Sequence, residues 1–161
     1  MQSDLKQRQR ALKAFETRFE CDLPATYKAF LLANCPWHKR EHEITSIPDK
    51  RFAVVEVREP FRLIRKRGRS VVYDLLETNE IIKGRTEAVF PPQAIAIGHT
   101  TTDEDICLFI AGRRKGQIWM KGWLTIEYHD RDDWRDDLFK LARSFDEFLE
   151  LVGEPSPLDR K

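Results

Sequence analysis

Four short apolar runs in the second half of the chain place the strongest constraint on its fold. They cover residues 94–97, 106–110, 117–120 and 124–128. Each run has the length of a β-strand, is rich in large apolar residues, and is bounded by turn residues. The connections at 111–116 and 121–122 are typical of hairpins, and hairpins join antiparallel neighbours. The sequence therefore predicts a mainly antiparallel sheet in the second half of the chain.

Helical periodicity marks the N-terminal part of the chain. Apolar side chains recur at the spacing of one helix face at Leu5, Leu12, Phe15 and Phe19. The run 23–32 predicts a second helix, with Asp22 as its candidate N-cap and Pro24 in its first turn. Asn34 tolerates the left-handed conformation that often ends a helix, so the second helix is expected to stop there.

Two further elements are predicted between the N-terminal helices and the sheet. Residues 52–57 have the composition of a short strand, and Pro60 either ends it or restricts it to the edge of a sheet. Ser70 is a candidate N-cap for a helix that extends toward Gly84. These elements connect the helical first part of the chain to the strand-rich second part.

A capping box predicts the last helix. Ser144 and Glu147 have its spacing, ahead of an apolar stretch that ends near Gly153. The predicted fold class is α+β, with N-terminal helices, a central and mainly antiparallel sheet of about four to six strands, and a C-terminal helix packed on the sheet. A chain of 161 residues has the usual size of one domain. We expect a single domain over residues 1–153 and a loose C-terminal tail over residues 154–161.

The charge balance limits the classes of partner. Charged residues make up 34% of the chain, but 28 basic side chains nearly cancel 27 acidic ones. Nucleic-acid-binding proteins usually carry a strong basic excess, so the composition argues against nucleic acid as the partner. A local basic cluster from Arg62 to Arg69 is the exception. Its role is open between a solvated loop and a nucleic-acid contact.

The cysteines and the N-terminal residues predict a cytoplasmic protein. Cys21, Cys35 and Cys107 form an odd set without the spacing of a disulfide framework, which favours reduced thiols. Residues 1–10 are polar and charged and lack the apolar region of a signal peptide. No stretch has the roughly 18 consecutive apolar residues of a membrane span. We therefore expect residence in the cytoplasm and no membrane contact.

Short blocks of residues follow one another in a distinctive order from the first helix to the last. The blocks are Phe15, Glu16, Leu23, Pro24, Tyr27, Phe30 and Leu31; Phe90, Pro91, Ile95, Ile97 and Gly98; Asp105, Ile106, Cys107, Leu108, Gly116, Gln117 and Ile118; and Leu141, Ala142, Ser144, Phe145, Phe148 and Leu149. In this order they resemble the successive signatures of the SUKH superfamily, the group that contains Smi/Knr-like domains. Two loops depart from that pattern. Cys35 and Pro36 stand where an Asn-Gly turn is common, and residues 99–104 contain no glycine.

The resemblance implies an α+β protein-binding module with no catalytic residues and no required cofactor. Many bacterial members of the superfamily resemble immunity proteins, which bind and neutralise toxins, often nucleases, whereas others are regulatory adaptors. The function expected from the resemblance is an immunity-type protein that neutralises a cognate toxin. The alternative is a regulatory or scaffolding interaction domain without a toxin partner. The identity of the partner and the oligomeric state are left open.

Acidic side chains are concentrated in two loops of the predicted sheet. They include Asp103, Glu104, Asp130, Asp132 and Asp133, and Trp123 and Trp134 lie near the second group. The first loop precedes one central strand and the second follows the last predicted strand, so both loops can share one end of the sheet. We predict that these carboxylates and tryptophans form a docking face for the basic surface of a nuclease toxin. The competing interpretation is a hydrated acidic loop that keeps the sheet end soluble.

Patterns for catalysis and metal binding are weak. The candidate zinc ligands are Cys35, His38 and His42, without a second Cys pair. His99 and His129 have acidic neighbours but no nucleophile motif. The segment from Gly112 to Gly116 lacks the Lys-Ser/Thr pair that completes a phosphate-binding loop. We therefore expect no enzymatic activity, no metal site and no cofactor.

Overall fold

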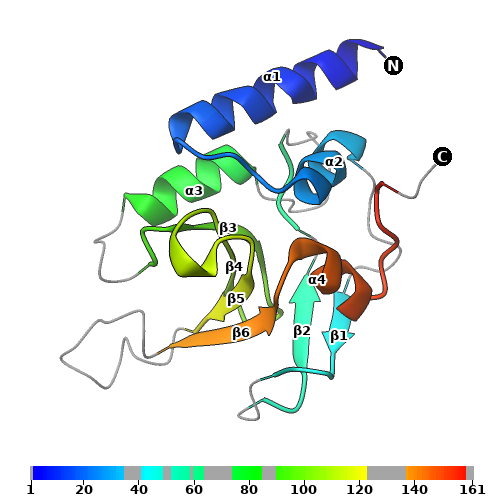
Figure 1. The fold of residues 1–161 in the computed structure, drawn as a ribbon, viewed down its shortest axis with the longest axis vertical. Coiled ribbons are helices and arrows are strands. Elements are labelled where there is room, and N and C mark those ends of the chain that lie inside the picture. The colour runs from blue at the N-terminus through cyan, green and yellow to red at the C-terminus, as the bar shows by residue number, and fades with distance from the viewer. Residues whose placement is uncertain are drawn as a thin grey trace.

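The computed structural model describes residues 2–34, 41–48, 52–58, 60–63, 74–84, 90–122 and 137–158. In this part of the chain the elements are, in order, α1 (Gln2–Arg18), α2 (Ala25–Ala33), β1 (Glu41–Ile44), β2 (Val55–Arg58), α3 (Leu75–Lys83), β3 (Ala94–His99), β4 (Asp105–Phe109), the 3₁₀ helix η1 (Gly112–Arg114), β5 (Ile118–Lys121), β6 (Leu138–Ala142) and α4 (Phe145–Leu151). The predicted α+β class, with helices at both ends and the sheet between them, is confirmed (Figure 1).

The strands form two antiparallel sheets. β3, β4, β5 and β6 pair in chain order as a four-stranded meander, while β1 and β2 form a two-stranded sheet. Backbone hydrogen bonds join the two sheets. The N–H of Thr101 donates to the carbonyl of Glu56 (3.0 Å), and the N–H of Phe61 donates to the carbonyl of Ile97 (2.9 Å). The turn between β3 and β4 therefore lies against β2.

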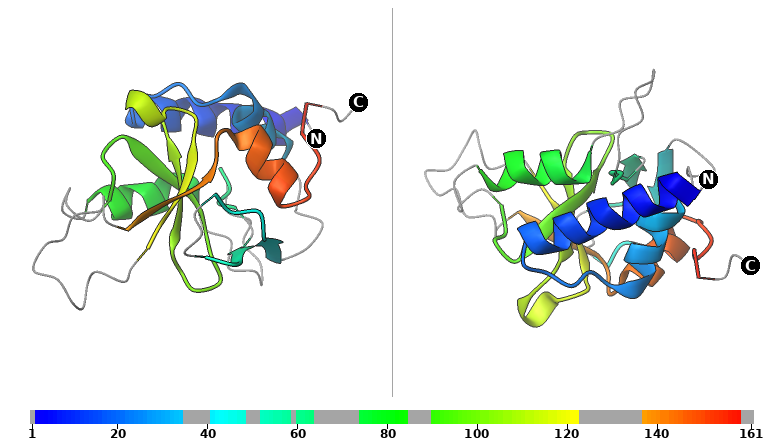
Figure 2. Two further views of the ribbon diagram at one scale, coloured as in Figure 1. Left: turned by 60° about the horizontal axis from the view of Figure 1, so that its bottom comes forward. Right: turned by 90° about the horizontal axis from the view of Figure 1, so that it is seen from above.

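Helices cover the sheet and close the core. α3 packs on β3, α4 packs on β6, and α1 packs on α2. Figure 2 shows α1 and α2 together on one side of the molecule, above the sheet in its left view. An ion pair from Arg18 Nε to Glu80 Oε1 (3.0 Å) joins α1 to α3. Between α2 and α4, the rings of Tyr27 and Phe30 contact that of Phe145, with centroids 4.7 and 5.4 Å apart.

A buried amide ties α3 to β3. Asn79 is fully buried, and its Nδ2 donates to the carbonyl of Ala96 while its Oδ1 accepts from the Ala96 N–H, each at 2.8 Å. Nδ2 also donates to the carbonyl of Leu75 (2.9 Å). The register between β3 and β4 shifts between Ala96 and Gly98. Asn79 thus pairs with the backbone of β3 as a neighbouring strand would.

The ends of α2 and α4 show which predicted caps form. α2 ends at Asn34, whose φ of 49° lies in the left-handed region, as predicted. The predicted capping residue of α4 is also confirmed, because Ser144 Oγ accepts from the N–H of Glu147 (3.1 Å). Asp22, in contrast, does not cap α2. The N-cap is Pro24, and the carboxylate of Asp22 instead pairs with the ammonium group of Lys28.

The predicted start of the third helix is wrong, and one strand of the sheet was not predicted. α3 begins at Leu75 with Asp74 as its N-cap, so the helix starts later than a cap at Ser70 would require. The predicted strand at 124–128 lies outside the described residues. β6 was not predicted, because its sequence Leu-Phe-Lys-Leu-Ala lacks the alternation of a half-exposed strand and is buried at every residue except the central lysine.

The segment after α4 returns to β1. Glu154 is buried, its N–H donates to the carbonyl of Leu149 (2.9 Å), and its Oε1 lies 3.1 Å from Nε2 of the buried His42. Glu154 is the first residue of the segment predicted as a loose tail. Within the ranges given above, no helix combines the length and the apolar character needed to cross a lipid bilayer.

Candidate functional site

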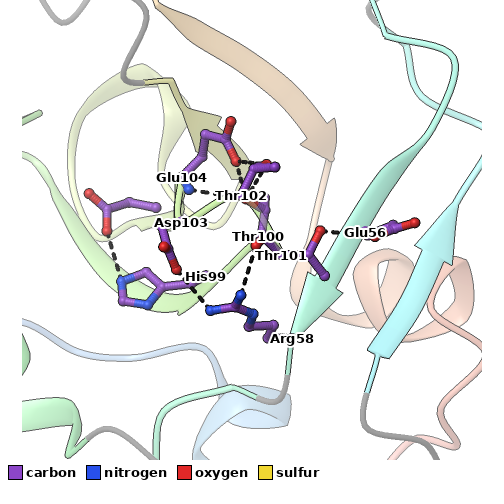
Figure 3. A network of polar contacts seen from close by, with 9 residues as sticks. Glu56, Arg58, His99, Thr100, Thr101, Thr102, Asp103 and Glu104 are labelled. Atoms are coloured by element: carbon purple, nitrogen blue, oxygen red, sulfur yellow. Dashed lines mark hydrogen bonds and ion pairs between the residues drawn. The ribbon is translucent and has the colours of Figure 1, made fainter. Parts of the chain in front are cut away.

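The turn between β3 and β4 carries the two described residues of the predicted docking face. It is closed by the N–H of Thr100, which donates to the carbonyl of Glu104 (2.9 Å), and by the N–H of Asp103, which donates to the carbonyl of Thr100 (3.2 Å). Asp103 has a φ of 69°, in the left-handed region that Asp adopts more readily than most residues. Asp103 and Glu104 therefore occupy a tight and defined turn (Figure 3).

An arginine of β2 holds Asp103. Arg58 Nη1 donates to Asp103 Oδ1 (2.8 Å), and Arg58 Nη2 donates to the carbonyl of Thr101 (2.7 Å). The side chain of Asp103 is still 73% exposed. Its charge is balanced by Arg58, so Asp103 adds little negative potential to this surface.

Threonine hydroxyls orient two further carboxylates. Glu104 Oε2 accepts hydrogen bonds from the hydroxyls of Thr100 and Thr102, the second at 2.5 Å. Glu56 Oε2 accepts from Thr101 Oγ1 (2.9 Å). Hydroxyl donors do not neutralise a carboxylate, and each carboxylate can accept several hydrogen bonds. The threonine hydroxyls therefore fix the direction of Glu56 and Glu104 without adding a positive charge beside them.

A cleft of about 230 Å³ lies where β2 and the residues before it meet the β3–β4 turn and β5. Its apolar part includes Phe52, Val54 and Met120, and its polar rim includes Glu56 and Glu104. Val54 is 45% exposed, which makes it one of the exposed large apolar side chains of the described chain. The cleft thus combines an apolar surface with two oriented carboxylates.

β1 adds another glutamate beside the cleft. Glu43 is paired directly with Glu56 across the β1–β2 ladder. Both side chains are exposed, whereas their strand neighbours Ile44 and Val55 are buried. Glu43 and Glu56 therefore share the outer face of the two-stranded sheet. Like charges directly opposite each other destabilise a strand pair, and a basic partner would relieve that repulsion.

Next to the turn, a row of ionisable side chains crosses the end of the larger sheet. His99 Nε2 lies 3.2 Å from Asp105 Oδ1, and Lys121 Nζ lies 3.4 Å from Asp137 Oδ2. Asp105 is paired with both His99 and Lys121 in the strand register. The side chains of Asp105, Lys121 and Asp137 are only 3%, 6% and 8% exposed. These charges are therefore internal and pair with one another, so they hold the strand ends together.

The rest of the predicted docking face lies outside the described residues. These residues are Trp123, Asp130, Asp132, Asp133 and Trp134. On either side of the segment that contains them, Lys121 and Leu138 are register partners in the sheet. Because Lys121 also pairs with Asp105, the segment starts and ends at the same end of the sheet as the β3–β4 turn.

Sequence reasoning missed the contribution of the smaller sheet. Glu56 and Arg58 come from β2 and meet the turn only through the fold, and Glu43 of β1 is the register partner of Glu56. Their sequence signal is the alternation of charged and apolar residues along each strand. That alternation indicates an exposed face but does not reveal what lies next to it.

Two of the candidate catalytic and metal-binding residues, His42 and His99, are described, and each contacts a neighbouring acidic side chain. His42 lies against Glu154, and His99 packs edge-on against Phe61 and pairs with Asp105. Cys35, His38 and His129 lie outside the described residues. Among the residues that are described, no three His, Cys, Asp or Glu side chains are grouped so as to hold a metal ion.

The two described cysteines are poor nucleophiles. Burial, with a smaller contribution from Glu16, raises the pKa of the Cys21 thiol to about 11. Burial also raises the pKa of the fully buried Cys107 thiol well above its ordinary value, and the charge of Asp105 adds to this effect. Both thiols therefore stay protonated at neutral pH, where the thiolate would be the reactive form.

The basic segments contribute to packing where they are described. Arg62 is buried, and its Nη1 lies 3.5 Å from Asn34 Oδ1. The remainder of the Arg62 to Arg69 cluster, apart from Leu63, lies outside the described residues. In the β4–β5 connection, the guanidinium of Arg114 stacks over Trp119, 4.7 Å from the ring centroid. The connection is a short 3₁₀ turn, as expected of an exposed hairpin loop and not of a phosphate cradle.

Comparison with known proteins identifies the family. No curated protein and no solved structure gives a significant match to this chain. A family model does match, that of the SMI1 / KNR4 family (SUKH-1), over residues 8–151. The match extends from α1 to the last residue of α4 and so includes the β3–β4 turn, the cleft and the buried row of charges. The chain therefore belongs to the SMI1 / KNR4 family (SUKH-1).

Proposed function

We propose that this chain is an immunity-type protein that binds a cognate toxin and neutralises it by occupying the toxin's functional surface. The observation that carries the proposal is the surface formed by β2 and the β3–β4 turn. It presents Glu56 and Glu104 in fixed directions next to a cleft with apolar side chains. An ordered surface of this kind binds with a smaller loss of conformational entropy than a mobile loop does.

The charge of this surface favours a basic partner. Glu43, Glu56 and Glu104 place three carboxylates on the outer face of the small sheet and on the turn, where the guanidinium of Arg58 is already engaged by Asp103. Nucleases that act on a phosphate backbone expose basic side chains in their active sites. An acidic inhibitor surface would be steered to such a site and would cover it. A nuclease domain is thus the toxin class that this surface suits best.

A catalytic role has less support. The ionisable side chains of the buried row at the end of the larger sheet pair with one another, and the described thiols are held protonated. An enzyme requires polar groups that converge on a substrate pocket. Here the cleft holds carboxylates engaged by hydroxyls but no described His or Lys. We therefore propose a binding function without catalysis.

Co-expression tests the proposed function. The chain would be expressed together with the product of the neighbouring open reading frame in cells that this product alone kills. A stable complex and restored growth are the expected results. Capture of only housekeeping proteins, with no protection, would instead favour a regulatory or scaffolding domain.

A charge-reversal variant tests the docking face within the same assay. Asp132→Lys/Asp133→Lys is expected to weaken protection, because both carboxylates belong to the segment that starts and ends beside the β3–β4 turn. Glu77→Lys on the exposed face of α3 is the matched control. Unchanged protection by the double variant would remove the second acidic loop from the docking face.

A further inference from the structure

The cleft between β2 and the β3–β4 turn has the chemistry of a receptor for one basic side chain. We propose that it receives an arginine or lysine of the partner protein, whose aliphatic stem lies on the apolar part of the cleft and whose charged end is bound by Glu56 and Glu104. This inference rests on the proposed protein-binding function and names the chemistry that the partner must present there.

The first support is the composition of the cleft wall. Among the described residues that line the cleft, the ionisable ones are Glu56 and Glu104, and none is a lysine or an arginine. The other lining side chains are apolar or are threonines, as at Thr102. An anionic rim around an apolar surface matches the long side chains of Arg and Lys, which bury their methylene stems and keep the charged end in a polar place.

The second support is the direction of the two carboxylates. In each, one oxygen, Oε2, accepts threonine hydroxyls from the turn: Thr101 for Glu56, and Thr100 and Thr102 for Glu104. The carboxylates are thereby held on the cleft rim before any partner arrives, while their remaining acceptor positions can bind N–H donors. Hydrogen bonds between charged groups are roughly twice as strong as those between neutral groups, so a guanidinium suits these acceptors well.

The third support is the arrangement around the rim. Glu43 lies directly opposite Glu56 across the strand pair, which places a second negative charge next to the first at a cost in stability. Val54 exposes 45% of its surface at the same place. An incoming cation would offset the repulsion between the two glutamates, and its aliphatic stem would cover the exposed valine. Both unfavourable features of the free surface would thus be relieved by one side chain.

A titration with small probes tests the cleft without the partner. The amide signals of the isotope-labelled full chain would be followed by NMR while Nα-acetyl-arginine methylamide is added. We expect saturable shifts confined to residues 54–56 and 100–104. The norleucine derivative, which keeps the stem without the charge, and the glutamate derivative should not give them. Shifts that are equally large with norleucine, or the absence of saturable shifts with arginine, would overturn the proposal.

Substitutions of the two cleft carboxylates test whether they bind the arginine probe. Glu56→Gln/Glu104→Gln preserves the hydrogen-bonding shape of both side chains and removes the two charges, so the apparent affinity for the arginine probe should fall by about tenfold, the equivalent of 1.4 kcal/mol. The matched control Glu77→Gln, on exposed α3, should leave the affinity unchanged. Equal affinity in the double variant and the control would show that the cleft does not bind through its carboxylates. The same NMR spectra report whether each variant is folded.

Measurements of toxin binding distinguish a failure of the cleft inference from a failure of the proposed immunity function. If a captured toxin is neutralised equally well and bound with unchanged affinity by Glu56→Gln/Glu104→Gln, the cleft inference fails and the immunity function stands. If no toxin is captured but the arginine titration behaves as expected, the immunity function fails and the cleft remains a site for basic side chains. A loss of toxin affinity of about tenfold or more in the double variant alone would support both.

Discussion

At the scale of single residues, Asn79 shows how a polar side chain can take the place of a strand. Its amide pairs with both backbone groups of Ala96, at the point where the register between β3 and β4 changes. From the sequence, Asn79 sits on a helix between Leu75 and Ile82 and has no marked role. The helical pattern predicts which face of the helix is buried. It does not predict the hydrogen-bond partner of a polar residue on that face, because the partner belongs to another element.

Removing this amide should destabilise the fold strongly. In Asn79→Ala, the N–H and the carbonyl of Ala96 lose their partners in a buried place, which we expect to cost about 3 kcal/mol or more. Thr78→Ala, at the preceding and less buried position of α3, is the control and should change the stability little. Urea unfolding of the three proteins measures the difference. A loss below about 1 kcal/mol in Asn79→Ala would mean that water satisfies Ala96.

At the scale of elements, the sequence predicts what local pattern and capping determine. The runs at 94–97 and 106–110 are strands in the structure, and the capping residue at Ser144 begins α4. β6 escapes prediction because burial on both faces removes the alternation that marks a strand. The cleft escapes prediction for a related reason. Glu56 and Glu104 are far apart in sequence, and only the contact between β2 and the turn brings them together.

The carboxylate of Glu147 in the first turn of α4 predicts a dependence of stability on pH. Hydrogen bonds from Arg143, first from its backbone N–H and then from its side chain, lower the pKa of Glu147 below its ordinary value of 4.5. A carboxyl group with a lowered pKa stabilises the folded state above its unfolded pKa, and this contribution is lost as the pH falls through the folded value. Glu147→Gln should therefore be less stable than the natural chain at pH 7, and the difference should shrink toward pH 3.

Chemical unfolding at both pH values measures that difference. Glu150→Gln, an exposed substitution on the same helix, is the control and should show no comparable change with pH. A gap between Glu147→Gln and the natural chain that stays constant from pH 7 to pH 3 would rule out the charge of Glu147 as the cause. The capping hydroxyl of Ser144 would then account for the helix start by itself.

At the scale of the whole molecule, the segment after α4 packs against β1, a contact that its composition does not predict. The family signatures run from α1 to α4, and the family match ends at residue 151. Beyond that point the chain crosses back to β1, where Glu154 meets His42 in a buried contact. Pro155 and Pro157 make this segment resemble a tail in sequence. A proline-rich composition indicates the absence of helix and strand but does not decide whether a segment packs on the domain.

The contact between Glu154 and His42 predicts that the folded domain extends beyond Gly153. Glu154→Ala leaves the buried His42 without this carboxylate, so we expect a loss of about 1–3 kcal/mol in the free energy of unfolding. A chain that stops after Gly153 should lose a similar amount, whereas one that stops after Leu158 should be as stable as the full chain.

Glu150→Ala, exposed on α4, controls for the removal of an acidic side chain nearby. Thermal and urea unfolding provide the comparison. If the chain ending at Gly153 equals the full chain in stability, the segment from residue 154 onward is a loose tail, as its sequence suggests, and the His42 contact does not contribute to folding.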